Sequence, residues 1–343
     1  ANVNRNGPAS GIAQFRGLYG DRVAAKVNGH TIIGAGPNAM DTPLSYTTPL
    51  IVESMSVYRG ITPVSAAIDT LGGAIEVTMR KAQLSDDKLE IAGEIQSGYR
   101  LNGNAKSLAT WTNIANKHHG IMVYGNQQRG DNQESGHGFD IPSTQFDKTQ
   151  VGIDYRIQHQ YGSTGASYHY TDTSNTGTAS LPMDINYIYG NRINLDGELL
   201  LDGWLVDWQW GALSAQHTMD NFSQRPNMNN AMYRSNLAKA NSADFSVNIS
   251  KNNVTYGIDG YFADHNSTIT NPNNKMFNIN NFNNVEDERL SIFAEYADQL
   301  NTDTQYHVGI RLKQANADAN KVSHHMAMMN ENIATLVSEF NAA

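Results

Sequence analysis

Residues 192–216 read RINLDGELLLDGWLVDWQWGALSAQ, and this stretch decides the fold. Apolar and polar side chains alternate through both halves, on either side of the pair Asp202-Gly203. Leu195, for example, falls on one face of an extended chain and Asp196 on the other. Strand side chains point alternately to two faces, and Asp-Gly is a preferred two-residue hairpin turn. The stretch therefore predicts two long antiparallel strands joined by a tight turn.

The same alternation recurs along most of the chain and predicts about eleven antiparallel strands. They are expected at 88–102, 106–117, 119–128, 146–158, 163–173, 187–201, 204–218, 239–250, 254–265, 287–300 and 304–315. Many exceed ten residues, whereas about five or six is usual in globular proteins. A spanning β-strand needs about 9–11 residues, so these strands are long enough to cross a membrane.

The links between these strands alternate in length. Short links rich in Gly, Asp and Asn are followed by long links, expected at 129–145, 174–186, 219–238 and 266–286. This parity is typical of an up-and-down outer-membrane barrel, with short periplasmic turns and long external loops. A soluble sandwich or propeller is the alternative, although Greek-key links give no such parity.

The composition excludes several classes of protein. The chain has 343 residues, of which 17% are charged, with a formal net charge of −9 and no cysteine. No cluster of basic residues indicates nucleic-acid binding, and no thiolate metal site or disulfide can form. We find no nucleophile–base pair and no phosphate loop, which argues against an enzyme.

The N-terminal region resembles a known domain. FRGLYGDRVAAKVNGHTI (15–32) is similar to the plug signature of TonB-dependent outer-membrane receptors, with Asn28-Gly29 where Asp-Gly is usual. LIVESMSVYRGITPVSAAIDTLGGAIEVTMRK (50–81) resembles the later plug signature. The residues that match there are Glu53, Arg59, Gly60, Gly72, Gly73 and Ile75.

The resemblance implies an all-β membrane barrel with an N-terminal mixed α/β plug. We expect a plug at 1–83 and a partial barrel at 84–343. Receptors of this kind close about 22 strands. The eleven strands expected here would then form half of a barrel, with the N-terminal TonB box and the C-terminal strands outside this sequence.

A second resemblance suggests a subfamily. GAGPNAMDTPLSYTTP (34–49) is similar to the plug loop of TonB-dependent copper receptors, which carry Cys-x-x-x-Met followed by Asp. Met40 and Asp41 match, whereas Gly36 stands at the cysteine position. The same receptors carry His-x-Met in the barrel, and His217 and Met219 match that pattern.

These residues predict a copper site at the external rim, formed by Met40, His217 and Met219. Thioethers are soft ligands that select Cu(I), and imidazole accepts either copper ion, so we expect Cu(I) to be preferred as the transported ligand. A weaker candidate set is His324, Met326 and Met328, beside a stretch whose latter half has helical spacing. Ordinary rim residues and a packed loop helix are the alternative interpretations of these two sets.

The function implied is copper import across the outer membrane of a Gram-negative bacterium. Its partners would be the lipid bilayer, the metal ion or a metal chelate, and the TonB energy-coupling complex at the periplasmic side, with no nucleic acid. Two alternatives remain open. One is a TonB-dependent receptor for a siderophore or other chelate with vestigial copper residues, and the other is a non-transporting surface protein with the same architecture.

Overall fold

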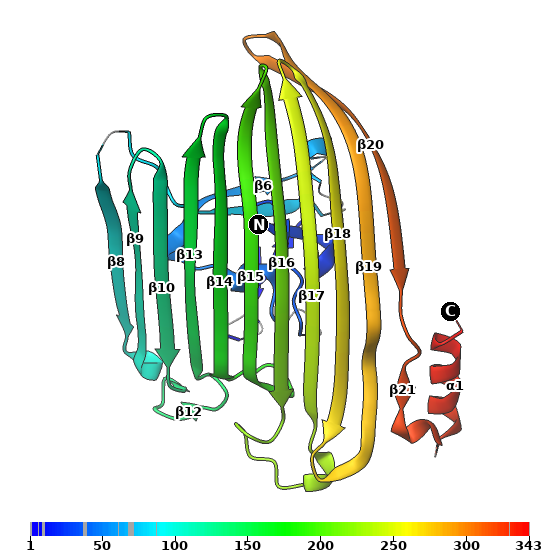
Figure 1. Ribbon diagram of the computed structural model, residues 1–343. Helices are drawn as coiled ribbons and strands as arrows, with labels where there is room; N and C mark the ends of the chain where they lie inside the picture. The colour runs from blue at the N-terminus through cyan, green and yellow to red at the C-terminus, as the bar shows by residue number, and fades with distance from the viewer. Residues whose placement is uncertain are drawn as a thin grey trace.

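The computed structural model describes residues 2–5, 7–8, 11–36, 40–60, 62–67, 72–86, 88–328 and 330–342. Its main feature is a large curved antiparallel sheet, with the N-terminal region lying against the concave side (Figure 1). Eleven of its strands pair in chain order. The predicted number of strands and their antiparallel meander are therefore confirmed.

The eleven strands have the following bounds. They are β8 (Glu90–Arg100), β9 (Ala105–Ala115), β10 (His119–Gly130), β13 (Phe146–His159), β14 (Gly162–Thr176), β15 (Asp184–Leu201), β16 (Trp204–Asp220), β17 (Ser235–Lys251), β18 (Val254–Asn271), β19 (Asn274–Asn301) and β20 (Thr304–Asp318). The short strand β21 (Ser323–His324) pairs with β19, and β11 (Gln133–Glu134) pairs with β12 (Asp140–Ile141). The helix expected near the C-terminal end of the sequence is α1 (Glu331–Phe340). Single 3-10 turns are η6 (Asn102–Asn104), η7 (Asn230–Met232) and η8 (His325–Met328).

The hairpin that was read from the sequence forms as expected. β15 and β16 pair along their full lengths, and Asp202 and Gly203 have φ angles of 50° and 78°. Both residues thus adopt the left-handed region that a type I′ turn requires. The tight link at 202–203 lies at one end of the sheet, and the long links at 177–183 and 221–234 lie at the other (Figure 1).

One predicted long link is wrong. Residues 266–286 belong to two strands instead. β18 continues to Asn271 and β19 begins at Asn274, which leaves a two-residue turn between them. The segment is rich in Asn, so its side chains show no apolar alternation. Strand pairing uses backbone groups, however, and the Pro272-Asn273 turn suits a hairpin without any apolar face.

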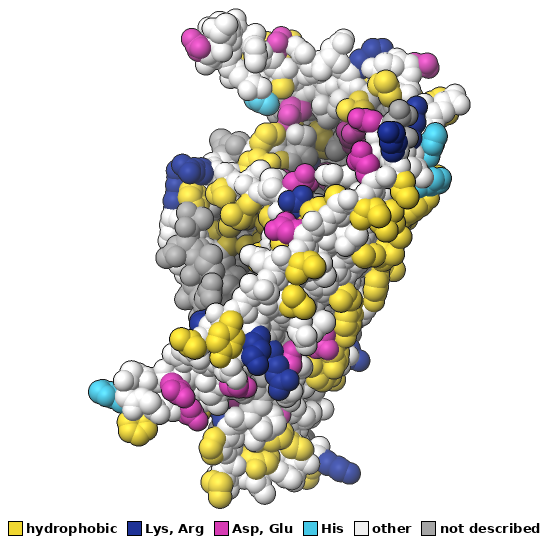
Figure 2. Space-filling view, turned by 90° about the vertical axis from the view of Figure 1, so that its left-hand side faces the viewer, with side chains coloured by type: hydrophobic (Ala, Val, Ile, Leu, Met, Phe, Trp, Pro, Cys, Tyr) yellow, Lys and Arg dark blue, Asp and Glu magenta, His cyan; other side chains and the backbone are white. Residues whose placement is uncertain are grey.

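The two faces of the sheet differ as the alternation predicts. Ile193, Leu195 and Trp210 are 49%, 38% and 39% exposed on the convex face, whereas His217 and Gln150 on the concave face are buried. Figure 2 shows hydrophobic side chains gathered in a band along the convex face. No helix in the described ranges is long and apolar enough to cross a membrane.

The N-terminal region forms two smaller sheets. One joins β1 (Asn2–Arg5), β2 (Gly11–Phe15) and β3 (Leu18–Tyr19), and the other has the order β5 (His30–Thr31), β4 (Ala24–Val27), β7 (Ala74–Met79) and β6 (Val52–Tyr58). The links between these strands contain the 3-10 helices η1 (Gly20–Arg22), η3 (Pro43–Tyr46), η4 (Pro49–Ile51) and η5 (Val64–Ala66). β4 and β7 run parallel, and their inward side chains Val27 and Val77 are buried with Ile51. The expected domain boundary, residue 83, lies in the connection between β7 and β8.

Hydrogen bonds join the N-terminal region to the wall of the large sheet. Lys148 donates to the Ser45 carbonyl at 2.6 Å, and the Ala82 amide donates to Asp154 at 2.7 Å. Buried polar groups need such partners, because an unpaired one costs about 1–3 kcal/mol. The polar concave wall therefore fixes the position of the region packed inside it.

Replacing Ile51 tests the packing of the N-terminal core. Ile51 is 1% exposed, so Ile51→Ala leaves a cavity and should cost about 2–5 kcal/mol. Met55 on β6 is 63% exposed, so Met55→Ala should stay within about 0.5 kcal/mol. Hydrogen exchange of β4 and β7 amides would report the difference, and equal effects of the two substitutions would contradict this core.

Candidate functional site

The two barrel residues predicted as ligands lie at one end of β16. His217 and Met219 face the concave side and are 0% and 4% exposed. They pair across the sheet with Ile188 and Ile185, which are also buried. The alternation therefore placed both side chains on the correct face. Both lie at the end of β16 that leads into a long link, where they were expected.

The third predicted ligand lies in the loop that precedes η3. Met40 is 3% exposed and belongs to the same buried apolar cluster as Met219. The next residue, Asp41, is 1% exposed and lies beside His217. The loop has thus risen to the same end of the sheet as the two barrel residues. Whether the three side chains bind one ion stays a prediction.

Asp41 organises this loop through its carboxylate. It accepts hydrogen bonds from the Ala35 amide at 2.8 Å, the Gly36 amide at 2.6 Å and the Tyr46 hydroxyl at 2.8 Å. Burial on its own raises the pKa of Asp41, but His217 and these hydrogen bonds favour the charged form and hold the pKa below its usual value. A buried carboxylate therefore remains ionised next to the imidazole.

The imidazole of His217 lies beside Asp41 without a normal hydrogen bond to it. Its Nδ1 lies 3.5 Å from Asp41 Oδ1, which is within ion-pair range but longer than a normal hydrogen bond. Neither ring nitrogen has a hydrogen-bond partner among the residues that the structure describes. Buried polar groups are nearly always satisfied. A fully buried imidazole in this state has the capacity to bind a further group.

Gly36 lies directly against that imidazole. A Cβ atom built on Gly36 would fall 1.9 Å from His217 Nδ1 and 2.6 Å from Asp41 Oδ1. The His217 ring therefore occupies the space of a side chain at position 36. This is the position where the copper receptors carry cysteine, so the departure noted in the sequence falls inside the candidate site.

The weaker candidate set lies elsewhere. His324 ends β21 beside β19, and Met326 follows in η8, near the β20 edge of the sheet (Figure 1). The side chain of Met328 lies outside the described residues. No group of three or more His, Asp or Glu side chains in the described part of the chain could hold a metal ion.

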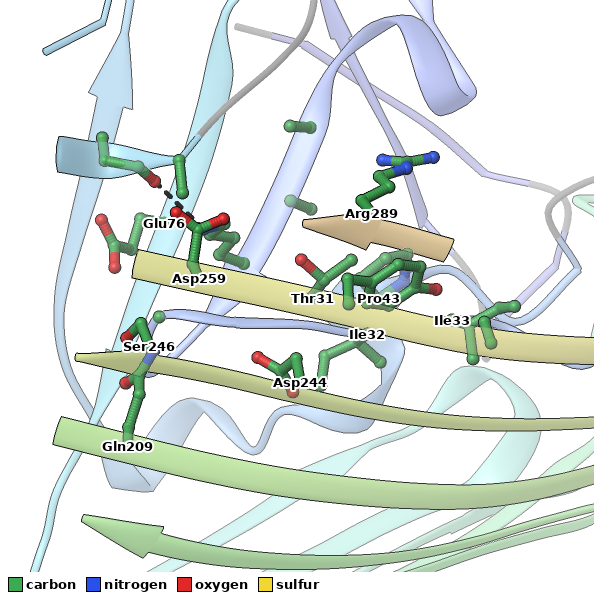
Figure 3. Close-up of a pocket in the computed structure, with 18 of the residues that line it drawn as sticks. Thr31, Ile32, Ile33, Pro43, Glu76, Gln209, Asp244, Ser246, Asp259 and Arg289 are labelled. Atoms are coloured by element: carbon green, nitrogen blue, oxygen red, sulfur yellow. Dashed lines mark hydrogen bonds between the residues drawn. The ribbon is translucent and has the colours of Figure 1, made fainter. Parts of the chain in front are cut away.

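A cavity of about 1780 Å³ adjoins the site. Gly36 and Asp41 line one part of it, and Asp244 and Asp259 project into it from β17 and β18 (Figure 3). Residues of the N-terminal region line the same cavity, and Glu76 lies beside Asp259 (Figure 3). Gly36 and Asp41 thus line this cavity, whereas Met40 in the same loop belongs to the buried apolar cluster.

Three long links close the other side of the site. Asp184, at the start of β15, is fully buried and accepts from Arg225 Nε at 2.7 Å and Arg225 Nη2 at 2.5 Å. It also accepts from the Ser143 hydroxyl at 3.0 Å and the Thr178 amide at 2.8 Å. One carboxylate thereby ties together the links at 131–145, 177–183 and 221–234, one residue from Ile185, the cross-strand partner of Met219.

Sequence reasoning missed the supporting residues of the site. Tyr46 stands five residues after Asp41 in the loop that carried the resemblance, yet nothing in the sequence indicated its hydrogen bond. Asp184 and Arg225 are 41 residues apart and gave no local signal at all.

Comparison with known proteins identifies structures that share this fold. No family model and no curated protein matches the sequence. Among solved structures, the copper transporter OprC gives a TM-score of 0.81 at 18% identity, covering 94% of this chain and 52% of that one. The chain has the fold of TonB-dependent receptors. The FrpB iron transporter from Neisseria meningitidis gives 0.64 at 14% identity, covering 94% of this chain and 54% of that one.

The same fold is found in a chelate receptor. The pyoverdine outer membrane receptor FpvA from Pseudomonas aeruginosa PAO1, bound to pyoverdine, gives a TM-score of 0.68 at 10% identity, covering 94% of this chain and 53% of that one. The chain therefore spans about half the length of these structures. The expected architecture, half of a barrel with an N-terminal region inside it, is confirmed, and all three of these structures are transporters or receptors.

Removing the Tyr46 hydroxyl tests the role of Asp41. Tyr46→Phe deletes one hydrogen bond to a charged group and should cost about 1.5–3 kcal/mol of local stability. Hydrogen exchange of a peptide covering residues 34–41 should accelerate. Tyr58→Phe is the matched control, because that hydroxyl also donates to a carboxylate, that of Glu76 on β7, at 3.2 Å. Unchanged exchange in Tyr46→Phe would show that Asp41 does not hold the loop through this bond.

Replacing Arg225 tests the closure of the long links. Arg225→Gln removes both charged contacts to Asp184 and should cost about 1–3 kcal/mol locally, because the buried carboxylate loses its cation. Limited proteolysis should then cut residues 177–183 faster. Arg234 lies in the same link, where its guanidinium donates to the carbonyls of Ala231 and Tyr233 and lies over the Phe277 ring. If Arg234→Gln opened the links equally, the ion pair would not be what holds them together.

Proposed function

We propose that the chain is part of a TonB-dependent transporter in the outer membrane of a Gram-negative bacterium. The receptor fold, the apolar convex face and the polar concave face support this proposal. In this arrangement the convex face contacts lipid, and the tight turns at 160–161, 202–203, 252–253 and 302–303 face the periplasm. The energy-coupling partner is the TonB complex, acting from that side.

We infer further that the cargo is copper, bound as Cu(I) by Met40, His217 and Met219. The observation that carries this inference is that the fully buried His217 imidazole, beside Asp41, has no hydrogen-bond partner among the described residues. Met40 and Met219 belong to one buried apolar cluster. Thioether and imidazole donors suit a soft monovalent ion. Asp41 supplies a negative charge that stabilises a cation without having to be one of its ligands.

The ligand set can be tested with Ag(I) alone as the probe, because silver shares the softness of Cu(I). Met219→Leu keeps the side-chain volume and removes the sulfur, so Ag(I) affinity should fall about tenfold or more, or about 1.4 kcal/mol, with folding intact. His217→Ala should lose at least as much. Met228→Leu is the control, because Met228 is 97% exposed in a long link. Isothermal titration of the purified protein in detergent micelles measures each affinity.

A chelate receptor is the second candidate function. Two observations favour it: Gly36 provides no thiolate, and the adjoining cavity has room for more than an ion. The copper site would be rejected if the wild-type protein bound neither Ag(I) nor Cu(I). It would also be rejected if Met219→Leu left the Ag(I) titration unchanged. Either result would leave the chelate receptor as the candidate.

A further inference from the structure

We propose that His265 is a positioning residue for the candidate copper site, an inference that rests on the function proposed above. His265 lies on β18 and donates from Nε2 to the Ala35 carbonyl at 2.6 Å. Its ring is held by a tilted contact with Phe282, with the two ring centroids 4.7 Å apart. A side chain of the large sheet thus binds the backbone of the loop that carries Met40.

The hydrogen bond from His265 is made to the peptide unit that joins Ala35 and Gly36. The carbonyl of Ala35 accepts from His265, and the amide of Gly36 in the same planar unit donates to Asp41 at 2.6 Å. A rotation of that unit would break both hydrogen bonds. Because Gly36 is the residue that lies against His217, the orientation of this peptide sets the wall of the site opposite the imidazole.

The strand between the two histidines leaves room for the loop. On β17, Ala238 pairs with His217 and Ala240 pairs with His265, and both alanines are fully buried. His217 and His265 therefore approach the loop from β16 and β18, with two small side chains between them.

The chemistry of the contact separates a positioning role from simple packing. The bond requires a hydrogen on Nε2, which the Nε2-protonated neutral tautomer and the imidazolium both supply. Glutamine offers a donor of similar reach, whereas phenylalanine keeps an aromatic ring against Phe282 but donates nothing. If only shape mattered, phenylalanine would be the better substitute.

Three variants of the purified protein in detergent micelles test the proposal. His265→Phe should accelerate hydrogen exchange of a peptide covering residues 34–41 and weaken Ag(I) binding about ten- to a hundredfold, the usual effect of losing a supporting contact to a metal site. His265→Gln should restore most of both. Ser267→Ala is the control, because Ser267 is buried on the same strand and its hydroxyl accepts from Asn236, away from the loop.

The two readouts keep this proposal separate from the proposed function. Faster exchange in His265→Phe with rescue by His265→Gln supports positioning of the loop, even if the wild-type protein binds no Ag(I), a result that would overturn the copper site alone. Unchanged exchange and Ag(I) affinity in His265→Phe would overturn the proposal. So would equal defects in His265→Phe and His265→Gln, because packing would then explain them.

Discussion

The structure depends on the polar concave wall of the large sheet. Period-2 alternation gives each long strand an apolar face and a polar face, and curvature turns the polar faces toward one another. Whatever packs inside must then satisfy Gln150, Asp154 and the other buried polar groups of the wall. The N-terminal region does so largely with hydroxyls and backbone groups, for example Thr48 Oγ1 to Gln150 and the Ala82 amide to Asp154.

At the end of the sheet under the long links, the character of the wall changes. Ile185, Ile188 and Leu213 add buried apolar side chains to this part of the concave face. Electrostatic interactions are stronger in such surroundings than in water. The Asp41 carboxylate beside His217 therefore lies where electrostatic interactions are strong.

The fold could be predicted where the signal is local. Leu195 and Asp196 already showed the two faces of β15, and Asp202-Gly203 showed the turn. The prediction failed at 266–286 because the Asn-rich hairpin carries no apolar periodicity, although its backbone pairs normally. In the site, alternation placed His217 and Met219 correctly. The partners that hold the loop could not be found in this way, because their contacts join residues as distant as Ala35 and His265.

Gly36 shows why the motif alone is a poor guide to the site. In the sequence, the missing side chain indicates the loss of a ligand. In the structure, a Cβ atom at Gly36 would lie 1.9 Å from His217 Nδ1, so a side chain there and the present position of the ring are incompatible. Removing a thiolate also removes a negative charge, and Asp41 keeps one within 3.5 Å of the imidazole. In the site proposed above, two thioethers, one imidazole and one nearby carboxylate would balance a single positive charge. On that proposal Cu(I) would be preferred to Cu(II), because a divalent ion in so buried a region would keep an uncompensated charge.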